Sequence, residues 1–455
     1  MKNSKNILLF FIAFLILLWN PLTFYLYYSS YDIYESRILH VIFWMIPILG
    51  FLTFFYVKRL KSISERLENM IFSCSFIGIA LAFLIFINFL IGLFAGSGDK
   101  ENEGLIFKPN SVAAYSTVEF NYLAEINSLG LRNKEIEIEK GKDTFRILCF
   151  GDSWTFGWGV DVEYSWPMQL ENYLKENGYT NVEVINCGQG GQFTSTYKEF
   201  VSKTVPLLKP DLVLVGVLQL DDLAQLFEHK LTESKGDIRS SKYMLKSFLS
   251  ASFGNYLTLF NRNGDQVVDI KAEWEHSNRG LIDDFSGLRQ LRFGTLSDTI
   301  QTLFRTGNLN PGLLNNYIDF PDRVIIFNNP DHPVTQEAIR AMSSDFEKMK
   351  EVCASNDAEL MFINLPMNYF TGHIVERMPS DILNDYFIEN NRIDSIYSSI
   401  ASTNQIPYLE LTSHFKSLTD KRKYFFKFDG HPNQDGYHEI ADQIGMHLIN
   451  NQYIK

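Results

Sequence analysis

The sequence predicts a doubly wound α/β sandwich with a mainly parallel five-stranded sheet, preceded by three transmembrane helices. Three observations support this prediction. The first 98 residues hold three long apolar runs with few charges. From about residue 145, short apolar strands alternate with helical segments, as in α/β proteins. A long interval of mixed character, about 225–331, interrupts that alternation and is expected to be an insertion.

The three apolar runs span about Ile7–Tyr28, Ile38–Val57 and Met70–Phe94. Each has roughly 20 residues, enough to cross about 30 Å of hydrocarbon as a helix. The alternative for the first run is a cleaved signal peptide. Its length, its lack of a small-residue cleavage site and the two runs that follow argue against it. Asn20-Pro21 interrupts the first run, which a spanning helix tolerates as a kink. We therefore predict that residues 1–98 form a membrane anchor.

The distribution of charge predicts the orientation of this anchor. Residues 1–98 contain seven Lys or Arg against four acids, with basic residues before the first run and in the loop after the second. The positive-inside rule places both basic segments in the cytoplasm, so three crossings leave the C-terminal domain outside the cytoplasm. The rest of the chain carries a net charge of −15. A surface this acidic argues against nucleic acid as a partner. The lipid bilayer is an expected partner because of the three apolar runs.

The remaining elements follow in chain order. Residues 99–144 are expected to be a linker with one peripheral strand, at 118–127, before the main domain, 145–455. The predicted core strands are 145–150, 182–188, 211–220, 359–364 and 406–411, and the predicted helices are about 166–176, 194–207, 335–355, 380–403 and 434–449. The continuous apolar character of the strands is typical of a parallel sheet that is buried on both faces.

The four cysteines, Cys74, Cys149, Cys187 and Cys353, have no zinc-ligand spacing and are too few for a disulfide framework. A bridge between Cys149 and Cys187 is conceivable, but buried free thiols are the better expectation. We predict neither a metal nor another cofactor.

Polar residues lie where the predicted strands end. The first core strand ends at Gly151-Asp152-Ser153, the second at "NCGQGGQ" and the third at "LQLDDL", and "KFDGHPNQDGYH" follows the last. Because the carboxyl ends of parallel strands share one edge of the sheet, these segments are expected to meet there. A hydroxyl, a glycine loop and an Asp-x-His pair supply the parts of a serine acyl hydrolase.

The residue types explain the first of these segments. Ser153 on the turn after a buried strand exposes its hydroxyl, and small Gly151 and Gly157 permit a tight turn and the approach of a substrate. The order is Gly-Asp-Ser-x-Thr and not the G-x-S-x-G elbow. His431 would accept the serine proton. Asp429, two residues earlier on the same side of an extended segment, would orient the imidazole.

These blocks resemble those of the SGNH/GDSL hydrolase superfamily. "FGDSWTFGWG" is similar to its first block, "VINCGQGG" to its second, "VGVLQLDDL" to its third and "FDGHPNQDGYHEIA" to its last, over about residues 145–450 without the insertion. The resemblance implies a flavodoxin-like three-layer α/β/α sandwich and metal-free hydrolysis or transfer of acyl esters. By position it implies Ser153 as nucleophile, His431 as base, Asp429 as orienting acid and Gly191 as oxyanion donor.

Two positions depart from the family's pattern. Many members place the Asp three residues before the His, whereas here the spacing is two. Asp221 occupies the position of the family's oxyanion Asn, and an ionised carboxylate there would repel the charge it should stabilise. Losing one such donor costs roughly a hundred- to a thousandfold in rate. Burial beside Asp222 would keep one carboxyl protonated, or Gln219 would supply an amide in a shifted alignment.

These features predict a membrane-anchored serine esterase or O-acyltransferase. Its expected substrate is an acylated extracytoplasmic glycan or a lipid-linked molecule, with O-acetyl esters as the expected class. One alternative is a lipase or thioesterase in which an aromatic stripe at 245–260 forms an apolar lid, although such a stripe is more often core. Another is an inactive envelope assembly or binding protein, which Asp221 favours.

Overall fold

The computed structural model describes residues 2–28, 37–60, 64–99, 104–234, 249, 252, 267–314, 318, 331–373 and 392–454. These form two compact units. The first contains the described residues up to 99, and the second contains 104–234 and the segments from 267 onward. The expected aromatic stripe at 245–260 lies outside the described residues, apart from 249 and 252.

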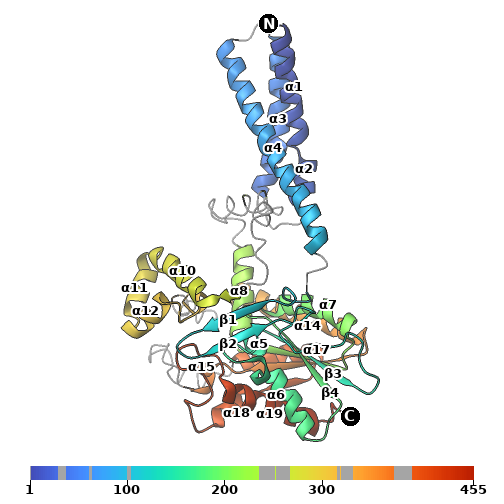
Figure 1. Ribbon diagram of the computed structural model, residues 1–455, viewed down its shortest axis with the longest axis vertical. Helices are drawn as coiled ribbons and strands as arrows, with labels where there is room; N and C mark the ends of the chain where they lie inside the picture. Colours follow the sequence, from blue (N-terminus) through green and yellow to red (C-terminus); the bar gives the residue numbers. More distant parts are fainter. Residues whose placement is uncertain are drawn as a thin grey trace. The chain divides into compact units, whose positions relative to one another are not determined.

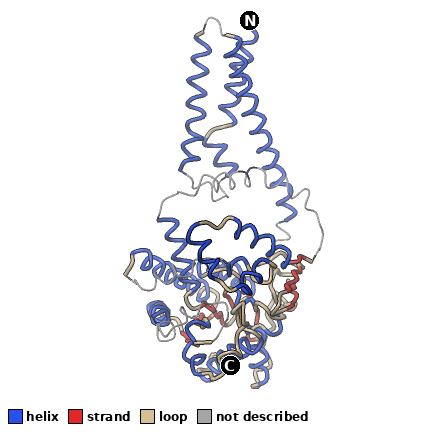
Figure 2. The backbone as a smooth tube through the Cα atoms, turned by 90° about the vertical axis from the view of Figure 1, so that its left-hand side faces the viewer, coloured by secondary structure: helices blue, strands red, loops and turns tan. Residues whose placement is uncertain are grey.

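The N-terminal unit consists of helices α1 (Lys2–Leu18), α2 (Pro21–Tyr28), α3 (Arg37–Arg59) and α4 (Glu65–Asp99). Helices α3 and α4 each hold a segment long and apolar enough to cross a membrane. The pair α1 and α2 meets this criterion only as one span, bent by 49° at the predicted Asn20-Pro21 break. There the Asn20 side chain accepts hydrogen bonds from the backbone of Leu22 and Thr23, which begins α2. Figure 2 shows α1, α3 and α4 running side by side.

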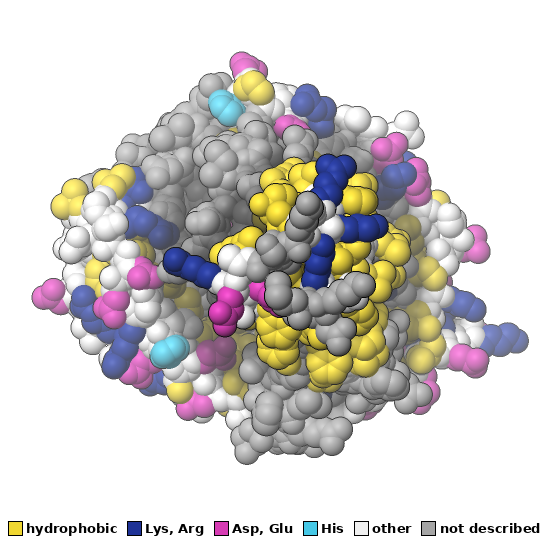
Figure 3. Space-filling model, turned by 90° about the horizontal axis from the view of Figure 1, so that it is seen from above, with side chains coloured by type: hydrophobic (Ala, Val, Ile, Leu, Met, Phe, Trp, Pro, Cys, Tyr) yellow, Lys and Arg dark blue, Asp and Glu magenta, His cyan; other side chains and the backbone are white. Residues whose placement is uncertain are grey.

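The surface of this unit is apolar along the helices. Large side chains such as Phe10, Leu17 and Leu52 are more than 60% exposed, and in Figure 3 such side chains surround Lys and Arg residues. Lys5 donates to the carbonyl groups of Lys58 and Leu60, so basic residues from α1 and from the end of α3 gather at one end of the bundle. Hydrocarbon-facing helices with basic ends are typical of membrane-spanning segments.

The second unit is built on a five-stranded parallel sheet (Figure 1). Its strands are β3 (Phe145–Gly151), β4 (Val182–Gly188), β5 (Leu212–Leu218), β7 (Glu359–Leu365) and β8 (Tyr408–Glu410). The strand order β4-β3-β5-β7-β8 is the 2-1-3-4-5 order of flavodoxin-like folds. The predicted fold class and the five predicted core strands are therefore confirmed.

Helices cover both faces of the sheet and create two apolar cores. Along β3, Leu148 and Phe150 pack in one core while Ile147 and Cys149 pack in the other, because successive strand residues point to opposite faces. The first core is completed by helices α7 (Thr194–Leu208), α8 (Asp221–Ser234), α14 (Pro333–Ala354) and α17 (Arg392–Asn404). The second is completed by α6 (Trp166–Glu176), α18 (Thr412–Ser417) and α19 (Gln434–Asn450).

Two parts of the unit lie outside this sandwich. Residues 104–144, expected to be a linker with one strand, contain an antiparallel pair, β1 (Val112–Ser116) and β2 (Asn121–Glu125), which β6 (Val268–Asp269) extends. The insertion, expected at about 225–331, starts later than predicted, because residues 225–234 belong to α8 and Leu226 and Phe227 pack in the first core. Further along, helices α10 (Ile270–Asp283), α11 (Gly287–Thr295) and α12 (Asp298–Arg305) form around a small apolar core of their own. All four cysteines are free, and Cys149, Cys187 and Cys353 are buried.

Candidate active site

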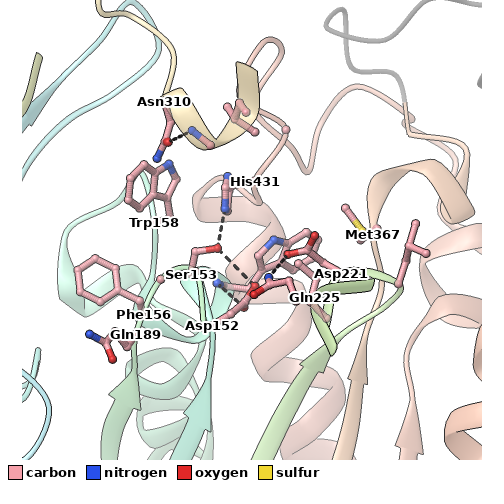
Figure 4. A pocket seen from close by; sticks show the side chains of 18 of the residues that line it. Asp152, Ser153, Phe156, Trp158, Gln189, Asp221, Gln225, Asn310, Met367 and His431 are labelled. Carbon is pink, nitrogen blue, oxygen red and sulfur yellow. Dashed lines mark hydrogen bonds between the residues drawn. The ribbon is translucent and has the colours of Figure 1, made fainter. Parts of the chain in front are cut away.

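Ser153, His431 and Asp429 meet at the carboxyl edge of the parallel sheet, and Figure 4 shows the contact between Ser153 and His431. Ser153 Oγ lies 2.8 Å from His431 Nε2, although 278 residues separate them in the chain. His431 Nδ1 lies 2.5 Å from Asp429 Oδ1. Since a carboxylate can only accept, Nδ1 carries the proton and Nε2 accepts from the serine hydroxyl. This is the tautomer that a base needs to receive the serine proton.

Ser153 begins the four-residue helix α5 (Ser153–Phe156), directly after β3. Asp152 caps this helix by accepting from Trp154 N, and Gly157 ends it in the left-handed conformation, with φ of 85°. A Cβ atom on Gly151 would lie 2.1 Å from Thr155 Oγ1 and 2.7 Å from the carbonyl oxygen of Gly216. Gly151 is therefore required for packing of the turn against β5, and not for the approach of a substrate as expected.

Asp429 and His431 lie on a tight turn, and the predicted extended segment at this position is wrong. Gly430 between them has φ of 86°, and Gly430 N donates to the carbonyl of Phe426. Asp429 Oδ1 also accepts from His431 N at 3.1 Å, so the acid orients both the backbone and the ring of His431. Asn368 from the segment after β7 donates to the Gly430 carbonyl. A two-residue spacing is therefore compatible with the Asp–His contact.

Two further residues, neither of them predicted from the sequence, form hydrogen bonds with this turn. Trp158 Nε1 donates to Asp429 Oδ2 at 3.3 Å, and its ring lies 5.6 Å from the His431 ring. Glu119, on the turn between β1 and β2, accepts from Phe428 N at 2.9 Å and from Asp429 N at 2.7 Å. Burial raises the pKa of Glu119, while these two backbone groups act in the opposite direction. No local pattern in the sequence links Glu119 to a site 310 residues away.

Arg132 holds the loop after the nucleophile in a comparable way. Its guanidinium is buried and donates to the carbonyl groups of Phe156, Gly157 and Val160. It also lies over the ring of Tyr122 at 4.9 Å and that of Phe156 at 4.5 Å. The hairpin region before the sandwich thus contacts both the nucleophile loop and the acid–base loop. A buried arginine has no sequence signal that separates it from a surface one.

The glycine loop after β4 lies beside the nucleophile. Gly190 and Gly191 both line the same cleft as Ser153. A Cβ atom on Gly190 would lie 3.6 Å from Ser153 Cβ, and Gly191 has φ of 74°, a conformation that favours glycine. The glycine loop therefore lies next to Ser153 on the wall of the cleft.

The surroundings of Asp221 bear on the two alternatives that the sequence left open for this position. Gln219 is fully buried, and its amide nitrogen donates to Asp394, so it does not supply an amide to the site. Asp222 is also buried and accepts from Leu218 N, and burial raises its pKa. Asp221 itself lines the cleft at the start of α8, where its Oδ2 accepts from Gln225 Nε2 at 2.8 Å.

Asp152 adds a second acid close to the nucleophile. Burial, together with the nearby charge of Asp221, raises the pKa of Asp152 to about 7, although its hydrogen bond from Trp154 N and the proximity of His431 oppose this. Asp152 Oδ2 lies 3.5 Å from Ser153 Oγ. Burial thus favours the protonated form of a carboxyl group that lies close to the serine hydroxyl.

The cleft around these residues has a volume of about 610 Å³. Its lining includes aromatic side chains, of Phe107, Tyr115, Phe156 and Trp158, and aliphatic or thioether side chains, of Leu218, Leu220, Ala224, Leu313 and Met367. Amide side chains of Gln189, Gln225 and Asn310 also face it. Asn310 and Leu313 belong to the insertion, which therefore forms part of the wall. Among the described residues, no cluster of His, Cys, Asp and Glu could hold a metal ion.

No family model and no curated protein matches this chain. Among solved structures it is similar to a lipase/acylhydrolase from Enterococcus faecalis, with 12% identity, 68% of this chain and 97% of the other covered, and a TM-score of 0.35. It is also similar to the acetyl xylan esterase AlAXEase, with 12% identity, 67% and 100% covered, and a TM-score of 0.34. A GDSL-like lipase from Bacteroides thetaiotaomicron has 11% identity, with 70% and 93% covered, and a TM-score of 0.30.

Strand order and the position of the motifs define the fold of this chain. The sheet has the flavodoxin-like strand order, and each motif quoted from the sequence lies at the carboxyl edge of this sheet. This part of the chain therefore has a flavodoxin-like α/β/α fold, with the segments that resemble SGNH/GDSL blocks at the carboxyl edge of its sheet.

Proposed function

We propose that this protein is a membrane-anchored serine esterase or O-acyltransferase, with Ser153 as nucleophile, His431 as base and Asp429 as orienting acid. The observation that carries the proposal is the continuous hydrogen-bonded series from Ser153 Oγ through the His431 ring to Asp429. Such a series activates a serine hydroxyl for attack on a carbonyl carbon.

In the first half-reaction, Ser153 Oγ attacks the ester carbonyl carbon while its proton passes to His431 Nε2. The carbonyl oxygen becomes an oxyanion, for which Gly191 is the proposed backbone donor. Collapse of the tetrahedral intermediate breaks the bond to the leaving alcohol, which takes the proton from His431. The product is an acyl-Ser153 ester, and Asp429 stabilises the transient imidazolium.

In the second half-reaction, a water molecule or an acceptor hydroxyl gives its proton to His431 and attacks the acyl carbon. Collapse of the second tetrahedral intermediate breaks the acyl–Ser153 bond, and Ser153 Oγ takes the proton back from His431, which restores the starting state. Water as acceptor gives an esterase, and a sugar hydroxyl gives an O-acyltransferase. The open cleft, with amide groups on its walls, suits an acceptor that carries several hydroxyl groups.

The anchor supports a substrate at the membrane surface. Basic residues gather at one end of the helical unit, which we propose is cytoplasmic, so that the catalytic domain lies outside. An O-acetylated envelope glycan or a lipid-linked sugar is the substrate class that this location favours. Fusing a reporter after Lys455 tests the topology, since activity of the reporter only in the cytoplasm would contradict it.

A fluorophosphonate probe tests the nucleophile directly. We expect the full-length protein in detergent to be labelled, and Ser153→Ala to prevent labelling. Unchanged labelling of Ser153→Ala, or no labelling of the native protein together with no ester turnover, would contradict the proposal. An inactive assembly protein would give the second result.

The aliphatic residues in the lining of the cleft favour a second candidate, a lipase or thioesterase. Leu218, Leu220 and Met367 offer an apolar surface for a longer acyl chain. Comparing p-nitrophenyl acetate with the octanoate ester separates the two candidates. A kcat/KM that rises steeply with chain length would favour the lipase, and a preference for acetate would favour the esterase.

A further inference from the structure

We infer that Gln225 supplies the side-chain amide to the oxyanion, and that Asp221 is a positioning residue that holds this amide. This inference rests on the proposed serine esterase function. The inference accounts for Asp221 at the position where the SGNH/GDSL hydrolases, which the sequence resembles, have an oxyanion asparagine.

The two residues lie one helical turn apart at the start of α8. Asp221 and Gln225 have the i, i+4 spacing that brings side chains together on one face of a helix. Gln225 Nε2 donates to Asp221 Oδ2 at 2.8 Å, and both residues line the cleft that contains Ser153. Figure 4 shows this pair on one side of Ser153.

The chemistry of the pair suits an oxyanion. A glutamine amide nitrogen carries two hydrogens, and the bond to Asp221 uses one of them, so the second can be donated to a substrate oxygen. Acceptance by a carboxylate fixes the orientation of the amide before the substrate arrives. A donor that is fixed in advance loses little free energy to reorganisation when the charge develops.

Other amides near the site are less suitable. Gln219 is fully buried and does not line the cleft, so a substrate cannot reach its amide. Gln189 and Asn310 line the cleft, but Figure 4 shows them on the opposite side of Ser153 from Asp221. Gln225 is therefore the amide that replaces the family's donor on the α8 side of the cleft.

The test compares Gln225→Met, which keeps the side-chain volume but removes the donor, with Gln225→Glu, which replaces the amide with a carboxylate. The control is Gln443→Met on α19, where the same i, i+4 arrangement bonds Gln443 to Glu439 outside the cleft. Turnover of p-nitrophenyl acetate by full-length protein is the assay, with thermal unfolding measured for every variant.

We expect both Gln225 variants to lower kcat by roughly a hundred- to a thousandfold, with KM changed by less than about threefold. The control should retain native kcat. In an Asp221→Asn background, which restores an amide at the family's position, Gln225→Met should cost less than about tenfold, because the two amides substitute for each other.

The outcomes separate the two proposals. If Ser153→Ala abolishes turnover while both Gln225 variants stay within about threefold of the native kcat, the inference is wrong and the esterase proposal stands. Equal losses from Gln225→Met in the native and Asp221→Asn backgrounds would also overturn the inference. Turnover that does not depend on Ser153 would refute the proposed function itself.

Discussion

The contact between Glu119 and the acid–base turn allows us to predict how a substitution of Glu119 changes kcat. Glu119 receives hydrogen bonds from Phe428 N and Asp429 N, which lie immediately before the catalytic turn. Replacing Glu119 with Gln leaves one acceptor oxygen for two N–H groups, and the new amide opposes the second N–H with another donor. Leaving one such group unpaired costs about 1–3 kcal/mol, at the lower end here because Glu119 is only partly buried and water can reach it.

The loss acts on the position of Asp429 and hence of His431. A displacement of about 1 Å at a catalytic group costs up to a hundredfold in rate, so we expect Glu119→Gln to lower kcat by about ten- to a hundredfold. KM should change little, because Glu119 does not line the cleft around Ser153.

Ester turnover and thermal unfolding of full-length protein measure both effects. Glu125→Gln is the matched control, since Glu125 ends β2 of the same hairpin and is exposed. Glu119→Asp shortens the side chain but keeps both oxygens and the charge, and should recover part of the activity. If Glu119→Gln matched Glu125→Gln in kcat, the turn would hold its geometry without Glu119 and the reasoning would be refuted.

Three further predictions follow from the same structure. Because the pKa of Asp152 is raised from 3.8 to about 7, the folded state keeps a proton that the unfolded state loses, and the contribution of Asp152 to stability decreases as pH rises between these values. Asp152→Asn should therefore make the melting temperature less dependent on pH between about 4 and about 7, and an unchanged slope would count against this pKa shift. Gly157→Ala should destabilise the protein by about 2–4 kcal/mol, measured by chemical unfolding, because φ is 85° and the new Cβ would lie 2.5 Å from Ser165 Cβ. His431→Ala should abolish ester turnover while leaving the melting temperature within a few degrees, since its side chain lies on the wall of the cleft.

Much of the fold follows from local patterns in the sequence. Strand β4 and helix α6 have the predicted bounds, and helix α7 differs by one residue. These elements are readable because a strand buried on both faces has a continuous apolar run and a core helix has an apolar stripe. Helices α3 and α4, which are long and apolar enough to cross a membrane, could be predicted equally well, because length and apolarity decide whether a helix can cross a bilayer.

The candidate site was readable only in part. Ser153, Asp429 and His431 could be assigned because they follow strand ends, and the ends of parallel strands converge in this fold. The bend at Asp429–His431 was not foreseen, because a single glycine in the left-handed conformation decides it. Residues 104–144 were expected to be mainly a linker, since short strands outside the main sheet leave a weak pattern.

The sequence by itself determined the layer architecture, the membrane-compatible helices and the order of the chemical groups along the chain. Only the tertiary structure decided which side chains contact these groups. Glu119 accepts from Asp429 N, Arg132 donates to the nucleophile loop at Gly157, and Gln225 donates to Asp221. The physical reason is the range of the interactions. The pattern of apolar and polar residues in a helix or strand repeats within a few residues, so a short stretch of sequence reveals it. A hydrogen bond between two loops depends on how distant segments pack and leaves no local pattern.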